Sequence, residues 1–184
     1  GEDGPTHQPV ETLSSLRAIP NLNVYRPADA VEVTECWALA LASKESPSVI
    51  ALTRQNVPTI RTEHMDENLS EKGAYLLSKA KSKRFATLIA SGSEVSIALA
   101  AQKILEAEHI GANVVSIPCW EKFDKQDEAY HRFILGEGIR VAVEAAIGHG
   151  WEKYLGDNGA FVGMTGFGAS AAGDKLYQHF GITA

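Results

Sequence analysis

Hydrophobic positions near the start of the chain switch between the spacing of a helix and that of a strand. Apolar residues recur at every third position within 8–18, behind a proline, which predicts a short helix. Residues 22–26 (LNVYR) read as a strand. Asp29 and Glu32 have the spacing of a capping box and predict a second helix that continues to about residue 43.

A nearly continuous apolar run follows at 48–53 (SVIALT) and predicts a strand buried on both faces of a parallel sheet. Arg54 lies at the end of this run. Residues 56–72 are polar and lack a clear period, so we expect an exposed connection between two domains there. The boundaries that this pattern predicts are a first domain at 1–57, a linker at 58–72 and a second domain at 73–184.

The second half of the chain alternates apolar runs with helical stretches. The predicted strands are 85–90, 113–117, 140–145 and 160–164. The predicted helices are 93–109, 124–135 and 170–180, with a short helical turn at 151–155. This rhythm predicts an α/β fold, with parts of two α/β domains that each contain a mostly parallel sheet.

Composition and charge narrow the class of protein. With 45% apolar residues the chain can form a packed core, and its net charge of −6 argues against a nucleic-acid or membrane-surface partner. No apolar run approaches the length of about 20 residues that a membrane span needs. Cys36 and Cys119 show neither metal-ligand nor disulfide spacing, so we expect buried free thiols in a cytoplasmic protein.

The densest candidate chemistry is the opening heptapeptide, Gly1-Glu2-Asp3-Gly4-Pro5-Thr6-His7. A Gly-Pro turn there would hold the Asp3 carboxylate and the His7 imidazole in a fixed relation. Histidine exchanges protons near neutral pH, and a carboxylate can orient it or bind a hydroxyl group. The structural alternative is that His7 caps the following helix and Asp3 forms an Asx turn.

Arg54 is the second candidate. Ligands of parallel α/β sheets bind beyond the carboxyl ends of the strands, and the guanidinium of arginine matches the geometry of a phosphate group. Its alternative is an ion pair with a surface carboxylate.

Three further patterns are weaker. The sequence at 166–171 matches G-x-G-x-x-A, but too little chain follows for a dinucleotide-binding unit, so we expect these glycines to permit close helix packing. Ser91 and Glu94 follow a strand and could hold a phosphate, but their spacing favours a capping box. His149 and Trp151 lie in a glycine-rich loop and could face a cleft or a subunit interface. The pattern is more typical of an ordinary loop histidine at His149.

Several long motifs together resemble the transketolase family. They are GEDGPTHQPVETLSSLRAIPNLNVYRPAD from residue 1, TRQN at 53–56, KGAYLL at 72–77, ASGSEVSIA at 90–98, SIPCWEKFDKQD from 116, and GFGASA at 166–171. The resemblance implies a thiamine diphosphate enzyme of the pentose phosphate pathway. Such an enzyme transfers a two-carbon ketol unit from a ketose phosphate to an aldose phosphate.

The resemblance also implies roles for single residues. His7 matches a histidine that hydrogen-bonds substrate oxygens near the reacting carbonyl and shuttles a proton. Asp3 matches an acid that contacts a sugar hydroxyl, and Arg54 matches an arginine that binds the substrate phosphate. The family binds thiamine diphosphate with Mg²⁺ or Ca²⁺, acts on sugar phosphates and works as a homodimer with its active site between the subunits.

The family's ligands for the diphosphate, for the metal and for the cofactor ring do not occur in this sequence. We therefore expect residues 1–57 to be the C-terminal part of a pyrimidine-binding domain. We also expect both ends of the chain to be cut and the chain alone to be inactive. Two alternatives stay open: an enzyme like 1-deoxyxylulose-5-phosphate synthase, whose strand-end motif resembles Pro-Arg-Gly-Asn instead of TRQN, and a non-catalytic α/β binding or interaction module.

Overall fold

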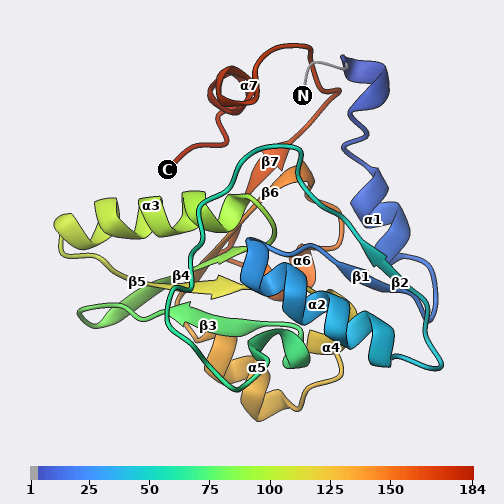
Figure 1. The fold of residues 1–184 in the computed structure, drawn as a ribbon. Helices are drawn as coiled ribbons and strands as arrows, with labels where there is room; N and C mark the ends of the chain where they lie inside the picture. The colour runs from blue at the N-terminus through green and yellow to red at the C-terminus, as the bar shows by residue number, and fades with distance from the viewer. Residues whose placement is uncertain (1–3) are drawn as a thin grey trace.

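The computed structural model describes residues 4–184, which form two sheets of unequal size (Figure 1). The smaller sheet has two parallel strands, β1 (Asn23–Tyr25) and β2 (Ser48–Ile50). The larger has five strands in the order β3-β5-β4-β6-β7. Both sheets carry helices, so the predicted α/β class with mostly parallel sheets is confirmed.

The first sheet follows the predicted order of elements. A 3₁₀ turn, η1 (Pro5–His7), and the short helix α1 (Thr12–Arg17) precede β1, and α2 (Ala30–Ala42) connects β1 to β2. Asp29 caps α2 as predicted, because its side chain accepts a hydrogen bond from the Glu32 amide at 2.9 Å.

The run at 48–53 does not form the predicted strand, buried on both faces. Only Ser48–Ile50 is extended, and all three residues are half-buried. The reason is that β2 pairs with β1 alone among the described residues, so its other edge lies outside a sheet.

The second sheet confirms the four strands predicted in the second half, with boundaries shifted by a few residues. They are β4 (Arg84–Ala90), β5 (Gly111–Ser116), β6 (Ile139–Ile147) and β7 (Ala160–Met164). The pairs β4–β5, β4–β6 and β6–β7 are parallel. A fifth strand that the pattern did not predict, β3 (Tyr75–Ser78), pairs antiparallel with β5 at the edge.

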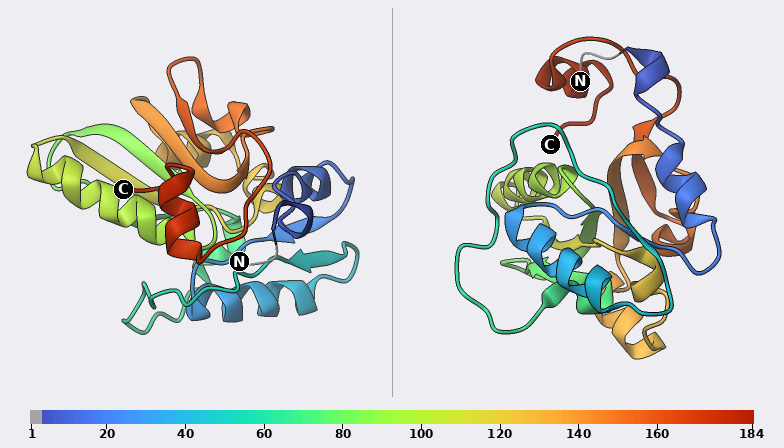
Figure 2. Two further views of the ribbon diagram at one scale, coloured as in Figure 1. Left: turned by 90° about the horizontal axis from the view of Figure 1, so that it is seen from above. Right: turned by 45° about the vertical axis from the view of Figure 1, so that its right-hand side comes forward.

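Helices cover both faces of this sheet (Figures 1 and 2). One face packs against α3 (Glu94–Ala107) and the segment around α7 (Gly173–His179), and its core includes Leu88, Val114 and Met164. The other face packs against α4 (Trp120–Phe123), α5 (Glu128–Leu135) and α6 (Glu152–Leu155). No helix within residues 4–184 is long and apolar enough to cross a membrane.

The polar stretch at 56–72 is attached to α2 over much of its length. The Asp29 carboxylate accepts a hydrogen bond from the Ile60 amide at 2.7 Å, and Arg61 pairs with Glu35 at 2.7 Å. The stretch ends in a 3₁₀ turn, η2 (Leu69–Lys72), where the buried Ser70 hydroxyl donates to Glu35. These contacts hold the connection against the first sheet.

The two sheets also contact each other directly. The Arg26 amide donates to the Pro118 carbonyl at 2.8 Å, and the Gly92 amide donates to the Arg26 carbonyl at 2.9 Å. Tyr25, Cys36 and Cys119 form a small buried cluster between them, and both cysteines are free thiols as predicted. Arg26 therefore lies where the two sheets meet.

Candidate functional site

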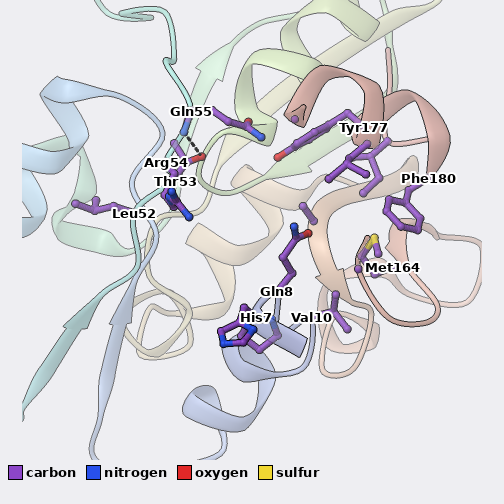
Figure 3. A pocket seen from close by; sticks show the side chains of 16 residues that line it. His7, Gln8, Val10, Leu52, Thr53, Arg54, Gln55, Met164, Tyr177 and Phe180 are labelled. Atoms are coloured by element: carbon purple, nitrogen blue, oxygen red, sulfur yellow. Dashed lines mark hydrogen bonds between the residues drawn. The ribbon is translucent and has the colours of Figure 1, made fainter. Parts of the chain in front are cut away.

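A pocket of about 300 Å³ lies between the start of the chain, the loop after β2 and the C-terminal helix α7 (Figure 3). Figure 1 shows the segment that begins at η1, in dark blue, and α7, in dark red, above the same end of the large sheet. The lining residues come from these separate segments and are His7, Gln8, Pro9, Val10, Leu52, Thr53, Arg54, Gln55, Ala145, Met164, Gly168, Gly173, Leu176, Tyr177, Phe180 and Ile182.

His7 lies at the end of η1, and its side chain is exposed. The turn begins at Gly4, whose φ of 76° favours glycine, and the His7 amide donates back to the Gly4 carbonyl at 3.2 Å. The Thr6 hydroxyl lies 2.9 Å from Nδ1 of His7. The Gly-Pro turn thus forms as expected. Asp3, the other candidate residue of this turn, lies outside the described residues.

Arg54 lies in the loop after β2 and not at the last residue of the strand, because β2 ends at Ile50. The loop turns sharply there, and the Gln55 amide donates to the Thr53 hydroxyl at 3.2 Å (Figure 3). Arg54 is exposed and lines the pocket that His7 also lines. The fold therefore brings together two of the three candidate residues.

The remaining wall of the pocket is mainly apolar. It consists of Val10, Met164, Leu176, Phe180 and Ile182, with the ring of Tyr177 beside them. A pocket with an apolar wall and a few convergent polar groups is typical of a small-molecule site. The imidazole of His7 and the guanidinium of Arg54 suit an elongated ligand with hydroxyl groups and an anionic end.

A buried charge network adjoins this pocket through Tyr177, which belongs to both. Glu144 on β6 accepts two hydrogen bonds from the Arg17 guanidinium, both of 2.8 Å, and a third from the Trp151 indole at 3.0 Å. The Ser91 hydroxyl donates to the same carboxylate at 2.5 Å. Burial alone would raise the pKa of Glu144, but Arg17 and Arg26 and these hydrogen bonds lower it to about 2.

Glu94, at the start of α3, forms the other half of the network. It pairs with Arg26 at 2.6 Å and accepts a hydrogen bond from the Tyr177 hydroxyl at 2.5 Å. Burial would lower the pKa of Arg26, but Glu94 and Glu144 raise it, so this arginine keeps its charge. Burial and then Glu94 raise the pKa of Tyr177, which therefore remains a hydrogen-bond donor.

The predicted capping box of Ser91 and Glu94 is wrong. The residue that caps α3 is Ser93, without a side-chain capping bond. The side chains of Ser91 and Glu94 are instead buried and belong to the charge network, because the Arg26 guanidinium is a stronger, charged partner for each of them. Trp151 is fully buried, and His149 contributes only its backbone carbonyl, which accepts from the Ser14 hydroxyl at 3.1 Å.

The G-x-G-x-x-A pattern lies in the loop between β7 and α7 and does not open a helix, because α7 begins at Gly173. Gly168 is buried against the Gln8 side chain. The predicted close packing of a helix is therefore wrong at this glycine, because its partner is Gln8 near the start of the chain.

Within residues 4–184, no three His, Cys, Asp or Glu side chains form a group that could hold a metal ion. The described residues do not fit the divalent cation that the sequence resemblance implies. A cation of that kind would be held by other residues.

Two family models match most of the chain. The "Transketolase, pyrimidine binding domain" matches residues 1–59, and the "Transketolase-like TK C-terminal domain" matches residues 73–183. The second match alone covers more than half of the sequence.

The chain belongs to the transketolase family.

Its relatives and solved neighbours agree with this assignment. A transketolase of Sinorhizobium medicae is 59% identical over 185 residues, a match that covers 100% of this chain and 27% of the relative. The structure of transketolase from Leishmania mexicana is 45% identical with a TM-score of 0.90 and covers 100% of this chain and 26% of that one. The chain thus spans about a quarter of the length of the curated transketolases that it matches.

Two other structures carry informative descriptions. A transketolase of Pichia stipitis in complex with sedoheptulose 7-phosphate is 40% identical, with a TM-score of 0.91, and covers 100% of this chain and 26% of that one. A "split gene transketolase, inactive beta4 tetramer" is 26% identical, with a TM-score of 0.81, and covers 98% of this chain and 60% of that one. The family match favours transketolase over the alternative of 1-deoxyxylulose-5-phosphate synthase.

Proposed function

We propose that this chain supplies the sugar-phosphate side of a transketolase active site. The enzyme would transfer a two-carbon ketol unit from a ketose phosphate to an aldose phosphate. The observation that carries the proposal is that His7 and Arg54, from segments that lie far apart in the sequence, line one pocket.

The two candidate residues of this pocket suit different groups of a sugar phosphate. Arg54 would bind the phosphate through charge-assisted hydrogen bonds, for which a guanidinium has the right geometry. His7 would hydrogen-bond the oxygens near the reacting carbonyl and move a proton between them. Asp3 would contact a sugar hydroxyl and help select its stereochemistry. The apolar wall at Met164 and Phe180 would exclude water from one side of the ligand.

The remaining parts of the enzyme would come from outside these residues. Thiamine diphosphate, with Mg²⁺ or Ca²⁺, would supply the chemistry that carries the two-carbon unit, and the match of residues 1–59 to a pyrimidine-binding domain supports this cofactor. The division into domains at 1–57 and 73–184, joined by a linker at 58–72, belongs to the same proposal.

A second subunit would complete the site in a homodimer. Trp37 and Leu41 of α2 are 49% and 78% exposed, which leaves an apolar surface for a further subunit or segment to cover. The buried free thiols support a reducing compartment such as the cytoplasm. The chain by itself would be inactive, in keeping with the description of the split-gene relative.

The test is an Arg54→Ala variant in a protein of the full transketolase length that carries this chain. Loss of charge-assisted hydrogen bonds worth about 1.5 to 3 kcal/mol lowers kcat/KM for a phosphorylated acceptor by about tenfold to 150-fold. A non-phosphorylated acceptor lacks the group that Arg54 binds, so its kcat/KM should hardly change. Equal losses for both acceptors would reassign Arg54 to a structural role.

A further inference from the structure

Each of the two candidate residues is followed by a glutamine that lines the same pocket. His7 and Arg54 are exposed, whereas Gln8 and Gln55 are half-buried. In Figure 3 the side chains of Gln8 and Gln55 reach into the pocket from different walls. Because each glutamine directly follows a candidate residue, contacts of the glutamine side chain also restrain the backbone of that candidate residue.

Both glutamines pack against glycines of one segment, Gly168–Gly173, which lies between the end of β7 and the start of α7. A Cβ added at Gly168 would lie 2.9 Å from both Cβ and Oε1 of Gln8. A Cβ added at Gly173 would lie 3.0 Å from Cδ of Gln55 and closer still to its Nε2. A side chain at Gly168 would collide with Cβ of Gln8, whereas one at Gly173 would fit only if the end of the Gln55 side chain moved.

The segment is fixed at both ends. Before it, β7 is paired with β6 up to Met164. After it, α7 is held by the Tyr177 hydroxyl, which donates to the buried Glu94 at 2.5 Å, and by the buried Leu176. The segment also approaches the turn at the start of the chain, because a Cβ added at Gly4 would lie 3.9 Å from Cβ of Ser170.

From these contacts we propose that the Gly168–Gly173 segment is a positioning element that sets the distance between His7 and Arg54. Through that distance it selects the length of the sugar phosphate that spans the two residues. This inference rests on the proposed function, since it concerns the same site. It gives the C-terminal domain a role in substrate selection through Gly168 and Gly173.

The two contacts differ in a way that predicts different effects. At Gly168 the obstacle includes Cβ of Gln8, which moves only with the backbone, so Gly168→Ala displaces the turn that carries His7. At Gly173 the obstacle is the outer part of the Gln55 side chain, which can turn away, so Gly173→Ala disturbs the Arg54 loop less. Neither glycine has a positive φ, so alanine adds no backbone strain at these positions.

The experiment measures kcat and KM of the full-length protein with phosphorylated and non-phosphorylated acceptors. Gly168→Ala should lower kcat by about 10- to 100-fold for both acceptors, because a displacement of about 1 Å at a catalytic group costs up to 10²-fold. Gly173→Ala should raise KM by about three- to tenfold, and only for the phosphorylated acceptor. Gly166→Ala is the matched control, since a Cβ there meets nothing within 4 Å, and it should behave as the wild type.

A double variant separates positioning from general disturbance. Gln55→Ala removes the atoms that a Cβ at Gly173 would meet, so Gly173→Ala should have no further effect on KM in the Gln55→Ala background. An effect of the same size in both backgrounds would contradict the claim that Gly173 positions the Arg54 loop through Gln55. Thermal unfolding of each variant checks that the fold persists.

Crystal structures of the same variants give a readout that does not depend on turnover. A displaced His7 turn in Gly168→Ala, with unchanged positions in Gly166→Ala, supports the positioning role. An unmoved His7 and Arg54 in both alanine variants overturns it, whatever the activity. If the wild-type protein transfers no ketol unit, the proposed function fails instead, and the structures still decide whether the segment positions these two residues.

Discussion

Replacing Glu144 by glutamine removes the negative charge that Arg17 and Arg26 share and keeps almost the same volume. The carboxylate is fully buried, and the side chain of Arg17 is only 5% exposed. After the change, Arg26 still has Glu94 at 2.6 Å, whereas among residues 4–184 Arg17 retains only neutral partners such as the ring of Trp120, 3.8 Å away. The variant therefore leaves one buried cation without an anion.

Two estimates of the loss in folding stability agree. Removing one partner of a buried ion pair destabilises a protein by about 3 to 5 kcal/mol. The pKa of Glu144 falls from its usual 4.5 to about 2. At about 1.4 kcal/mol for each pH unit between the two values, this corresponds to about 3 kcal/mol of stability. We expect Glu144→Gln to lower the free energy of unfolding by about 3 kcal/mol near neutral pH.

The pH dependence has a definite sign. Because the pKa of Glu144 is lower in the folded protein, its stabilising effect is complete above the unfolded value of 4.5 and is lost as the pH falls from there toward about 2. Glutamine does not titrate. The difference in stability between the wild type and Glu144→Gln should therefore be constant near neutral pH and should shrink below about pH 4.5.

Urea unfolding at several pH values measures this difference. Fluorescence is a suitable probe, because the Trp151 indole donates to Glu144. Glu137→Gln is the matched control, since Glu137 is exposed and the same charge is removed. An unchanged unfolding midpoint for Glu144→Gln near neutral pH, or a difference that stays constant down to pH 3, would refute the reasoning.

Two further predictions concern the site and the chain as a whole. His7→Ala in the full-length protein should lower kcat/KM by about 10² to 10⁴, the range for a positioned acid-base group, and normal turnover of a folded variant would remove His7 from the mechanism. The 184-residue chain alone should neither bind thiamine diphosphate with Mg²⁺ in a calorimeter nor transfer a ketol unit, because residues 4–184 contain no group of metal ligands. Micromolar binding would show that the site needs fewer residues than we propose.

Local patterns in the sequence determined most of the secondary structure. The strands β4 to β7 follow from mainly apolar runs. The central strands β4 and β5 are largely buried, as expected in a parallel sheet, whereas the edge strand β7 is mostly half-buried. Asp29 was recognised as a helix cap since its contact spans three residues. The edge strand β3 was missed, because Tyr75–Ser78 is short and pairs antiparallel with a strand that comes later in the chain.

The sequence also singled out His7 and Arg54, each by its residue type and its place beside a predicted element. That both line one pocket depends on packing between the start of the chain, the loop after β2 and α7. The contacts of Gln8 with Gly168 and of Gln55 with Gly173 have the same origin. No local pattern encodes a contact between segments so far apart.

The charge network shows most clearly what only the tertiary structure decided. Arg17 and Glu144 are 127 positions apart, and although Glu144 lies in the predicted strand 140–145, no local pattern pairs it with Arg17. Ser91 and Glu94 have the spacing of a capping box, and the sequence alone favours that reading. The fold places Arg26 between the two sheets, and a buried cation attracts carboxylates more strongly than the backbone amides at a helix end do. Spacing determines which local contacts are possible, whereas burial and charge in the folded protein determine which of them form.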